Sequence, residues 1–416
     1  MTLTSTRKDV PSLHDAVPGS PEALIEEARR RQRRRYRWMG AAVLVCVVAL
    51  ALGLVGIGGA GRHSPATSRT RLASSPSNHA RVRSFTLAGP FNPNQIITAG
   101  GMVWLVGSVP SSIDPSRCAI ESVNPTTLHR QLYPGPACGP NVAVGENQIY
   151  LTDVTYVGDS NDEQIQIERF DTVTRRATVL APVDMTLVGS SIAHTSMIYY
   201  EGSLWLWGYG APDGPGTGRN EVVQISAASG AVLRTITGIP AIGGIQPSMV
   251  VADGGLWLSG GAGGGPTVER ITSTASAPTV VYTAPSNSSV LWLAAVGTRI
   301  WAEEVTAESH LDTHLVGLSD NGHQILGTTP SDQNFAETAA VGTGGQLWAI
   351  GAGESCSSPL QLWRINTATG DANSVLTLLS SGEPCDANAR VAVSGRRVFA
   401  LVSGTPTPTV LFRVSD

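Results

Sequence analysis

An aromatic motif that recurs seven times most constrains how this chain can fold. Its clearest copy is GSLWLWG, from Gly202 to Gly208, in which a glycine turn leads into a branched apolar residue and a tryptophan. The aromatic positions of the copies are spaced 44 to 55 residues apart, at Trp104, Tyr150, Trp205, Trp257, Trp301, Trp348 and Phe399. A repeat of this length is typical of an array of small similar sheets rather than of one continuous core.

Two further strands accompany each aromatic motif. A signature strand follows it, best seen in LWRINTATG from Leu362 to Gly370, where alternating apolar and polar residues run into a tight turn. A strand of small residues precedes it, as at Val142 to Gly145. With a variable outer strand, this order describes a propeller blade whose aromatic side chains fill the wedge between neighbouring sheets. The sequence therefore predicts an all-β fold, a seven-bladed β-propeller over residues 81–416.

The ends of the repeat predict how the ring closes. The seventh signature strand, Leu411 to Val414, is followed only by Ser415 and Asp416, so the last blade is expected to lack an outer strand of its own. Residues 83–88, RSFTLA, precede the first blade and have no place in it. We expect this segment to complete the last blade, which would remove an open sheet edge.

Four segments are expected before the propeller. Residues 1–19 read as a disordered cytoplasmic tail, and residues 20–38 as a basic juxtamembrane helix with seven arginines between Arg29 and Arg37. Residues 39–60 contain no charge and are long enough to span a bilayer of about 30 Å, which predicts a transmembrane helix. Residues 61–80 are rich in Ser, Pro and Thr and are expected to form a flexible stalk.

The arginines before the apolar run predict the topology and one partner. By the positive-inside rule the amino terminus is cytoplasmic and the propeller extracytoplasmic, with the arginine cluster binding membrane lipid headgroups. A cleaved signal peptide is the alternative, with Gly58 and Ala60 as small residues at the cleavage site. Cys46 lies in the middle of the span and is read as a buried apolar residue.

Charge excludes one class of partner. Residues 81–416 contain 16 Arg and 27 Asp or Glu, and the only lysine of the whole chain is Lys8. Such an acidic domain repels phosphate backbones, so nucleic acid is not expected to bind it. The scarcity of lysine beside abundant Ala, Gly and Arg fits a high-GC genome such as that of an actinobacterium.

Four cysteines provide an independent indication of the compartment. Cys118 and Cys356 follow the aromatic strands of the first and sixth blades, and Cys138 and Cys385 precede the next inner strands. These two loop types leave the same face of a propeller. We therefore predict the disulfides Cys118–Cys138 and Cys356–Cys385, although four cysteines allow three sets of pairs, and an oxidising location outside the cytoplasm.

The paired pattern of G-x-L-W-L and L-W-R-I-N-x-x-T-G resembles the repeats of bacterial seven-bladed propellers of the YVTN type and the streptogramin B lyase type. The resemblance covers residues 81–416 and rests on residues that are structural in these proteins. The lyases use a magnesium-supported pair of His and Glu on one propeller face, which the resemblance does not place on positions of this chain.

One cluster could bind a divalent cation or perform acid–base chemistry. It lies after the fifth aromatic strand and comprises Glu303, Glu304, Glu308, His310, Asp312 and His314. A solvated acidic loop is the favoured interpretation, so neither a catalytic residue nor a cofactor is expected. The eight tryptophans of residues 81–416 at first suggest a ligand platform, but only Trp207 and Trp292 lack a place in the repeat.

The functional hypothesis is a membrane-anchored binding or scaffolding module that recognises an extracytoplasmic protein or a small molecule. A lyase or hydrolase with a metal-assisted site on the disulfide-bearing face is the alternative. A sensor that relays ligand occupancy to the cytoplasmic tail is a third class. Convergence of the Glu303 to His314 cluster with a second acidic or His group at the channel mouth would favour the enzyme.

Overall fold

The computed structural model describes residues 81–415 except 88, 90, 110–117, 136–138, 140, 157–162, 184–185, 188–194, 211–218, 240–247, 260–266, 273, 286, 307–312, 320–323, 329–332, 354–358, 381–387 and 404–408. The chain divides into the units Met1–Ser75 and Pro76–Asp416, and every described residue belongs to the second. The expected tail, basic helix, transmembrane helix and stalk lie outside the described residues. Among the residues that are described, no helix has the length and apolar character needed to cross a membrane.

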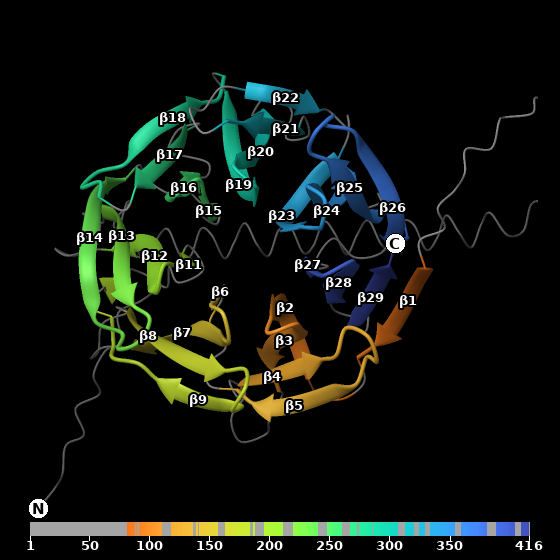
Figure 1. The fold of residues 1–416 in the computed structure, drawn as a ribbon, viewed down its shortest axis with the longest axis horizontal. Helices are drawn as coiled ribbons and strands as arrows, with labels where there is room; N and C mark the ends of the chain where they lie inside the picture. Colours follow the sequence, from red (N-terminus) through yellow and green to blue (C-terminus); the bar gives the residue numbers. More distant parts are fainter. Residues whose placement is uncertain are drawn as a thin grey trace, which may run out of the picture. The chain divides into compact units, whose positions relative to one another are not determined.

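Seven groups of four antiparallel strands stand around a common centre (Figure 1). The all-β, seven-bladed propeller predicted from the repeat is therefore confirmed. Blade 1 contains β2 (Asn92–Ala99), β3 (Met102–Ser108), β4 (Cys118–Val123) and β5 (Arg130–Pro134), and blade 2 contains β6 (Val142–Val144), β7 (Gln148–Tyr156), β8 (Glu163–Asp171) and β9 (Arg176–Val179). Blade 3 contains β11 (Ser196–Tyr200), β12 (Ser203–Gly210), β13 (Arg219–Ser226) and β14 (Val232–Ile239), and blade 4 contains β15 (Ser248–Ala252), β16 (Gly255–Ser259), β17 (Thr267–Thr272) and β18 (Thr279–Thr283). Blade 5 contains β19 (Ser288–Val296), β20 (Arg299–Thr306), β21 (Thr313–Leu318) and β22 (Gln324–Thr328), and blade 6 contains β23 (Gln333–Val341), β24 (Gln346–Gly353), β25 (Leu360–Asn366) and β26 (Ala372–Leu379).

Blade 7 is built from both ends of the propeller sequence. Its first three strands are β27 (Asn388–Ser394), β28 (Arg397–Ser403) and β29 (Val410–Ser415), and its outer strand is β1 (Arg81–Thr86). β1 pairs antiparallel with β29 from Arg81 opposite Ser415 to Thr86 opposite Val410. The closure expected from the sequence is confirmed, with the strand beginning at Arg81 rather than Arg83. All described strands and core clusters thus belong to one ring that is closed from within Pro76–Asp416.

A short strand joins two blades, which the repeat did not predict. β10 (Thr186–Leu187) pairs with β8 of blade 2 and, through Leu187 opposite Gly210, with β12 of blade 3. The two blades therefore form one nine-stranded sheet. The insertion after β9 that contains β10 is also why the step from Tyr150 to Trp205 is the longest of the repeat.

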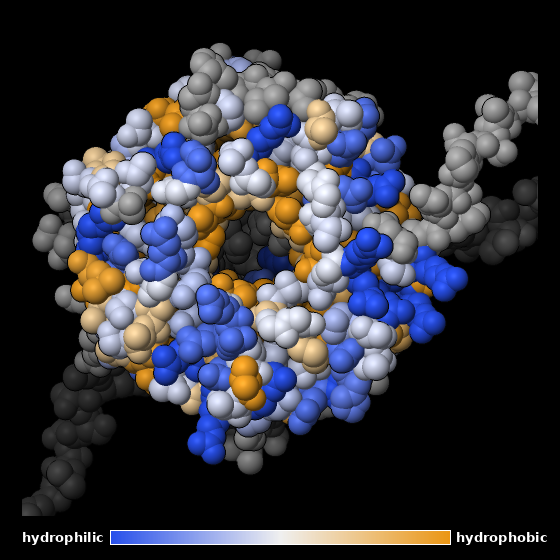
Figure 2. All heavy atoms as spheres, viewed as in Figure 1, coloured by the Kyte–Doolittle hydropathy of each residue, from blue (hydrophilic) through white to orange (hydrophobic). Residues whose placement is uncertain are grey.

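The aromatic residues occupy the wedges between blades, as expected. Trp104 on β3 packs against Ile149 and Leu151 of blade 2, and it is fully buried. Phe399 on β28 packs in the same way against Val103 and Leu105 of blade 1. Burial of this apolar surface is the main favourable term for ring formation, at about 25 cal/mol per Å². Figure 2 shows the ring hollowed at its centre, with hydrophobic residues around the opening.

The signature turns between the third and fourth strands share one hydrogen-bonded geometry. Asp171 accepts bonds from the backbone N–H groups of Val173 and Thr174 at 2.9 and 2.7 Å, and Asn124 and Asn366 serve equivalent turns. Four residues after these side chains the backbone turns through positive φ, at 62° in Arg175 and 80° in Gly370. Glycine adopts that conformation without steric cost, which explains the T-G ending of the best signature copy.

Candidate functional site

The two faces of the ring differ in the length of their connections. We call the face with the first-to-second and third-to-fourth strand connections the turn face, and the opposite face the loop face. Turn-face connections are short, such as Gly100 and Gly101 between β2 and β3. Loop-face connections are longer, such as 211–218 between β12 and β13, and most of their residues lie outside the described part of the chain. Functional residues occur disproportionately on loops held by a rigid scaffold, so the loop face is the first place to seek a site.

The structure separates two members of the acidic and histidine cluster. Glu303 and Glu304 are consecutive residues of β20, so their side chains point to opposite faces of the blade 5 sheet. Glu303 lies on the face of Trp301 and is fully buried. Glu304 accepts a hydrogen bond of 2.8 Å from the Tyr282 hydroxyl of blade 4. The two carboxylates therefore do not converge.

The rest of that cluster is only partly placed. His314 lies opposite Glu304 in the β20–β21 ladder, while Glu308, His310 and Asp312 lie outside the described residues. Among the described residues, no group of three His, Cys, Asp or Glu is arranged to bind a metal ion. A cation site that uses the undescribed loop stays a prediction.

Burial against blade 5 changes the acidity of Tyr282. Burial and the hydrogen bond to Glu304 raise the pKa of this tyrosine well above its ordinary value of 10.0. The hydroxyl stays protonated at any physiological pH and stays a donor. This contact between blades 4 and 5 is a structural element rather than an acid–base pair.

A row of buried carboxylates occupies equivalent positions in three signature strands. Glu121, Glu168 and Glu269 lie opposite Leu105, Leu151 and Leu258, which each follow the aromatic residue of the blade. All three are less than a tenth exposed. The repeat pattern gave no indication of these three glutamates, although each stands in a signature strand directly before Ser or Arg.

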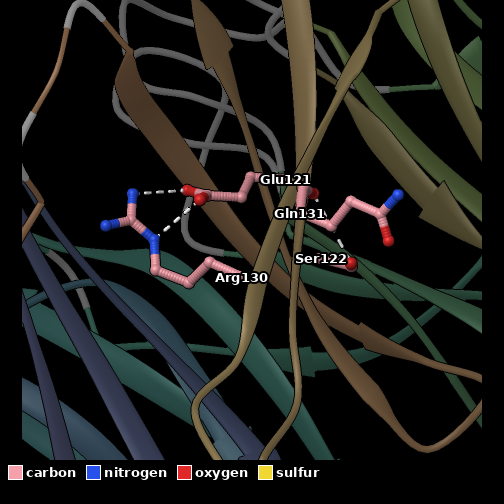
Figure 3. Close-up of polar contacts among 4 residues, drawn as sticks. All are labelled: Glu121, Ser122, Arg130 and Gln131. Atoms are coloured by element: carbon pink, nitrogen blue, oxygen red, sulfur yellow. Dashed lines mark hydrogen bonds and ion pairs between the residues drawn. The ribbon is translucent and has the colours of Figure 1, made fainter.

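Glu121 has a full set of partners. The Arg130 side chain of β5 donates from Nε to Oε1 at 2.6 Å and from Nη2 to Oε2 at 2.9 Å (Figure 3). A bidentate guanidinium–carboxylate pair of this kind satisfies both oxygens of the acid. On the opposite face of the same strands, the Ser122 hydroxyl donates to the Gln131 carbonyl at 3.5 Å. Blade 1 therefore neutralises its carboxylate within the sheet.

Glu269 and Glu168 lack such a partner. In each, Oε2 is buried without a hydrogen bond. Burial raises the pKa of Glu269 from 4.5 to about 7, and burial followed by the nearby charge of Asp153 raises the pKa of Glu168. Raised carboxyl pKa values occur at catalytic sites but also at buried structural positions. Both side chains lie within packed sheets, so we read them as structural.

The cysteines are placed only in part. Cys118, the first residue of β4, is disulfide-bonded, and Cys138, Cys356 and Cys385 lie outside the described residues. The Gly135 N–H donates to the Cys118 carbonyl at 3.0 Å on the loop face. Residue 138 follows only three positions later, which is a reach of about 10 Å. The two predicted pairs stay predictions.

Both unassigned tryptophans turn out to be core residues. Trp207 on β12 is fully buried against Leu256 and Leu258 of blade 4. Trp292 on β19 is 3% exposed and packs with Trp301 and Leu347. Neither can serve as a ligand platform. The alternation along β12 could have indicated this, because Trp207 lies two residues after Trp205 and so on the same face.

One polar cavity lies on the turn face of blade 6. Its volume is about 200 Å³, and it is lined by Gln346, Arg364, Asn366, Asp371 and Asn373. The Asn366 amide oxygen already accepts from the Ala368 N–H at 2.9 Å, and Asp371 accepts from the Thr369 hydroxyl at 2.7 Å. These bonds shape the signature turn, so the cavity is an outcome of turn geometry.

Comparison with known proteins extends only to the fold. No family model and no curated protein matches the sequence. The propeller domain of the trilobed protease from Pyrococcus furiosus superposes with a TM-score of 0.54 at 11% identity, over 79% of this chain and 94% of that one. A putative 6-phosphogluconolactonase from Bacteroides uniformis gives 0.50 at 13%, over 72% and 90%. Acylaminoacyl peptidase from Pyrococcus horikoshii gives 0.51 at 11%, over 77% of this chain and 50% of that one.

These likenesses show a shared β-propeller and no shared activity. The protease domain is described as having an open velcro topology, whereas β1 closes blade 7 in the present chain. The peptidase is about twice as long as the segment that matches it.

Proposed function

We propose that this chain is a membrane-anchored, extracytoplasmic β-propeller that acts as a binding or scaffolding module through its loop face. The observation that carries the proposal is the unequal construction of the two faces. Turn-face connections are short and repeat the same hydrogen bonds, whereas the loop-face connections vary from blade to blade. Variable loops on a rigid ring are the usual basis for specific recognition.

The cysteines support the extracytoplasmic part of this proposal. Cys118 is disulfide-bonded at the loop face, and disulfides persist mainly in oxidising compartments. We propose the pairs Cys118–Cys138 and Cys356–Cys385, which would each tie two neighbouring loop-face connections of one blade. Leu360 opposite Leu379 brings the strand ends flanking the second pair together, as Ala119 opposite Pro134 does for the first. The uncharged run at 39–60 supports the membrane anchor.

Topology is tested with the full chain carrying an epitope tag before Met1. Protease added to spheroplasts should digest the propeller and leave a tagged fragment protected inside, and alkaline carbonate should not extract that fragment. A propeller released into the medium without the tag would instead show a cleaved signal peptide. Protection of the propeller would overturn the extracytoplasmic assignment.

The loop-face function is tested against the enzymatic alternative by metal analysis of the purified chain. About one equivalent of bound divalent cation, lost together in Glu308→Gln and His310→Ala variants, would favour a metal-assisted lyase or hydrolase. Metal content well below one equivalent, with thermal stability unchanged by chelator, is the result that the binding module predicts.

A further inference from the structure

We propose that five arginines at one corner of blade 7 form a docking surface for anionic phospholipid headgroups. They lie on the turn face, and we call them the closure arginines: Arg81, Arg83, Arg396, Arg397 and Arg413. Docking there would hold the turn face against the bilayer and present the loop face outward. This inference rests on the proposed membrane anchor and adds the orientation of the propeller to it.

Strand register places four of these side chains on one face of the sheet. Arg83 of β1 stands directly opposite Arg413 of β29, while Arg81 and Arg397 lie on either side of Ser415. Arg396 adds a fifth charge from the exposed turn between β27 and β28. Neighbouring strands are about 4.8 Å apart, so the cluster spans roughly 10 Å across three strands. Figure 2 shows strongly hydrophilic side chains gathered over this part of the rim.

No carboxylate within the described sheet balances this charge. The described residues of β1, β27, β28 and β29 include five arginines and no Asp or Glu, the turn residue Arg396 adds a sixth arginine, and Asp416 lies beyond the described residues. The pKa of Arg413 is lowered by burial and then by the charges of Arg83 and Arg397. Like charges directly opposite in a sheet destabilise it. Arg413 also serves the fold, because its Nη1 donates to the carbonyl oxygens of Pro125 and Thr126 in blade 1 at 3.3 and 3.1 Å. Arg83 adds a like charge directly opposite it.

Protection of a free sheet edge is the structural alternative. Charged residues on an outer strand do discourage edge-to-edge pairing. Edge charge is not special to blade 7 and is not uniform either: β5, β9 and β14 each contain one arginine, whereas β18, β22 and β26 contain no charged residue. Moreover, Arg396, Arg397 and Arg413 do not belong to the edge strand. Edge protection therefore does not account for the cluster.

The position of the cluster along the chain selects a lipid surface as the partner. Arg81 is the first residue of the ring and lies on the turn face, and only residues 61–80 separate it from the uncharged run at 39–60. The flexible stalk that we propose for these 20 residues would have a mean span of about 25 Å. The anchor would therefore keep these arginines near headgroups, while the acidic remainder of the propeller is repelled.

The test uses the Pro76–Asp416 unit, whose ring closes without residues 1–75. Sedimentation with vesicles of 30% phosphatidylglycerol in phosphatidylcholine should show binding that weakens with salt, and pure phosphatidylcholine should show none. Each arginine near an anionic surface contributes about fivefold to binding. The double variant R83Q/R396Q should therefore bind the anionic vesicles at least about tenfold more weakly.

The matched control is R176Q/R364Q, which removes the same charge from blades 2 and 6. Its binding should change less than about twofold, and both variants should keep the wild-type fold by circular dichroism. Equal losses in the two variants would overturn the proposal, because net charge alone would then govern binding. Absence of wild-type binding at low salt, or equally tight binding to a soluble polyanion such as dextran sulfate, would also overturn it. The protease test of topology is independent of these outcomes.

Discussion

Replacing Glu269 with glutamine tests how the blades tolerate a buried carboxylate. The side chain is 5% exposed, and burial raises its pKa from 4.5 to about 7. A raised pKa means that the folded state binds the proton more tightly than the unfolded chain. Below about pH 4.5 the buried carboxyl therefore does not lower the free energy of unfolding. The loss of stability grows as the pH rises and reaches its full value above about pH 7.

The expected change in the free energy of unfolding follows from the shift in the pKa of Glu269. A change of about 2.5 pKa units corresponds to about 3 kcal/mol. Glutamine has the same shape and no charge, but its amide is also buried and costs about 1–2 kcal/mol when it lacks a partner. We therefore expect Glu269→Gln to raise the free energy of unfolding by about 1–2 kcal/mol at pH 8. At pH 4.5 the gain should disappear.

Urea unfolding of Pro76–Asp416, followed by tryptophan fluorescence, measures this difference at the two pH values. The control is Glu121→Gln, at the equivalent position of blade 1, where Arg130 already pairs with both carboxylate oxygens. That variant should lose stability at pH 8, because it breaks the pair. An equal gain for Glu269→Gln at both pH values, or a gain for Glu121→Gln, would refute the reasoning.

Three further predictions concern contacts between strands and blades. Tyr282→Phe removes the donor to buried Glu304 and should lower the free energy of unfolding by about 1–3 kcal/mol; an unchanged urea midpoint would contradict this. Arg83→Gln relieves the repulsion with Arg413 and should stabilise the ring by about 0.2–1 kcal/mol, a gain expected to vanish in an Arg413→Gln background. Deletion of residues 81–87 should open blade 7 and abolish cooperative thermal unfolding, whereas deletion of residues 1–19 should leave the melting curve unchanged.

The sequence was most informative where one residue type had one structural role. Trp104 and its equivalents could be located because only a large aromatic fills the wedge between blades, and their spacing predicted the blade number. The closing strand was predictable because a blade with three strands needs a fourth. β10 was not predictable, since a two-residue strand leaves no periodic pattern in the sequence.

The candidate site was harder to predict, because adjacency along a strand is not proximity in space. Glu303 and Glu304 looked like part of one cluster, yet the alternation of the strand sends them to opposite faces. Glu121, Glu168 and Glu269 lie far apart in sequence and share one structural position. Aligning the signature strands by their turns would have found this row. That only Glu121 is paired could not be predicted, because its partner Arg130 stands in an outer strand without a repeat pattern.

Closure by β1 also affects the order in which the propeller can fold during its synthesis. Ser415 donates a hydrogen bond to the carbonyl of Arg81 across a sequence separation of 334 residues. β1 is the first strand of the ring to be synthesised, and its partner β29 is the last. Both edges of β1 therefore stay unpaired until β29 has been synthesised and has come to lie beside it. Contacts between such distant residues slow folding, and an unpaired edge is open to pairing with other chains. A permuted chain that places residues 81–87 directly after β29 would turn this slowest contact into a local hairpin, and it should refold faster than the natural order.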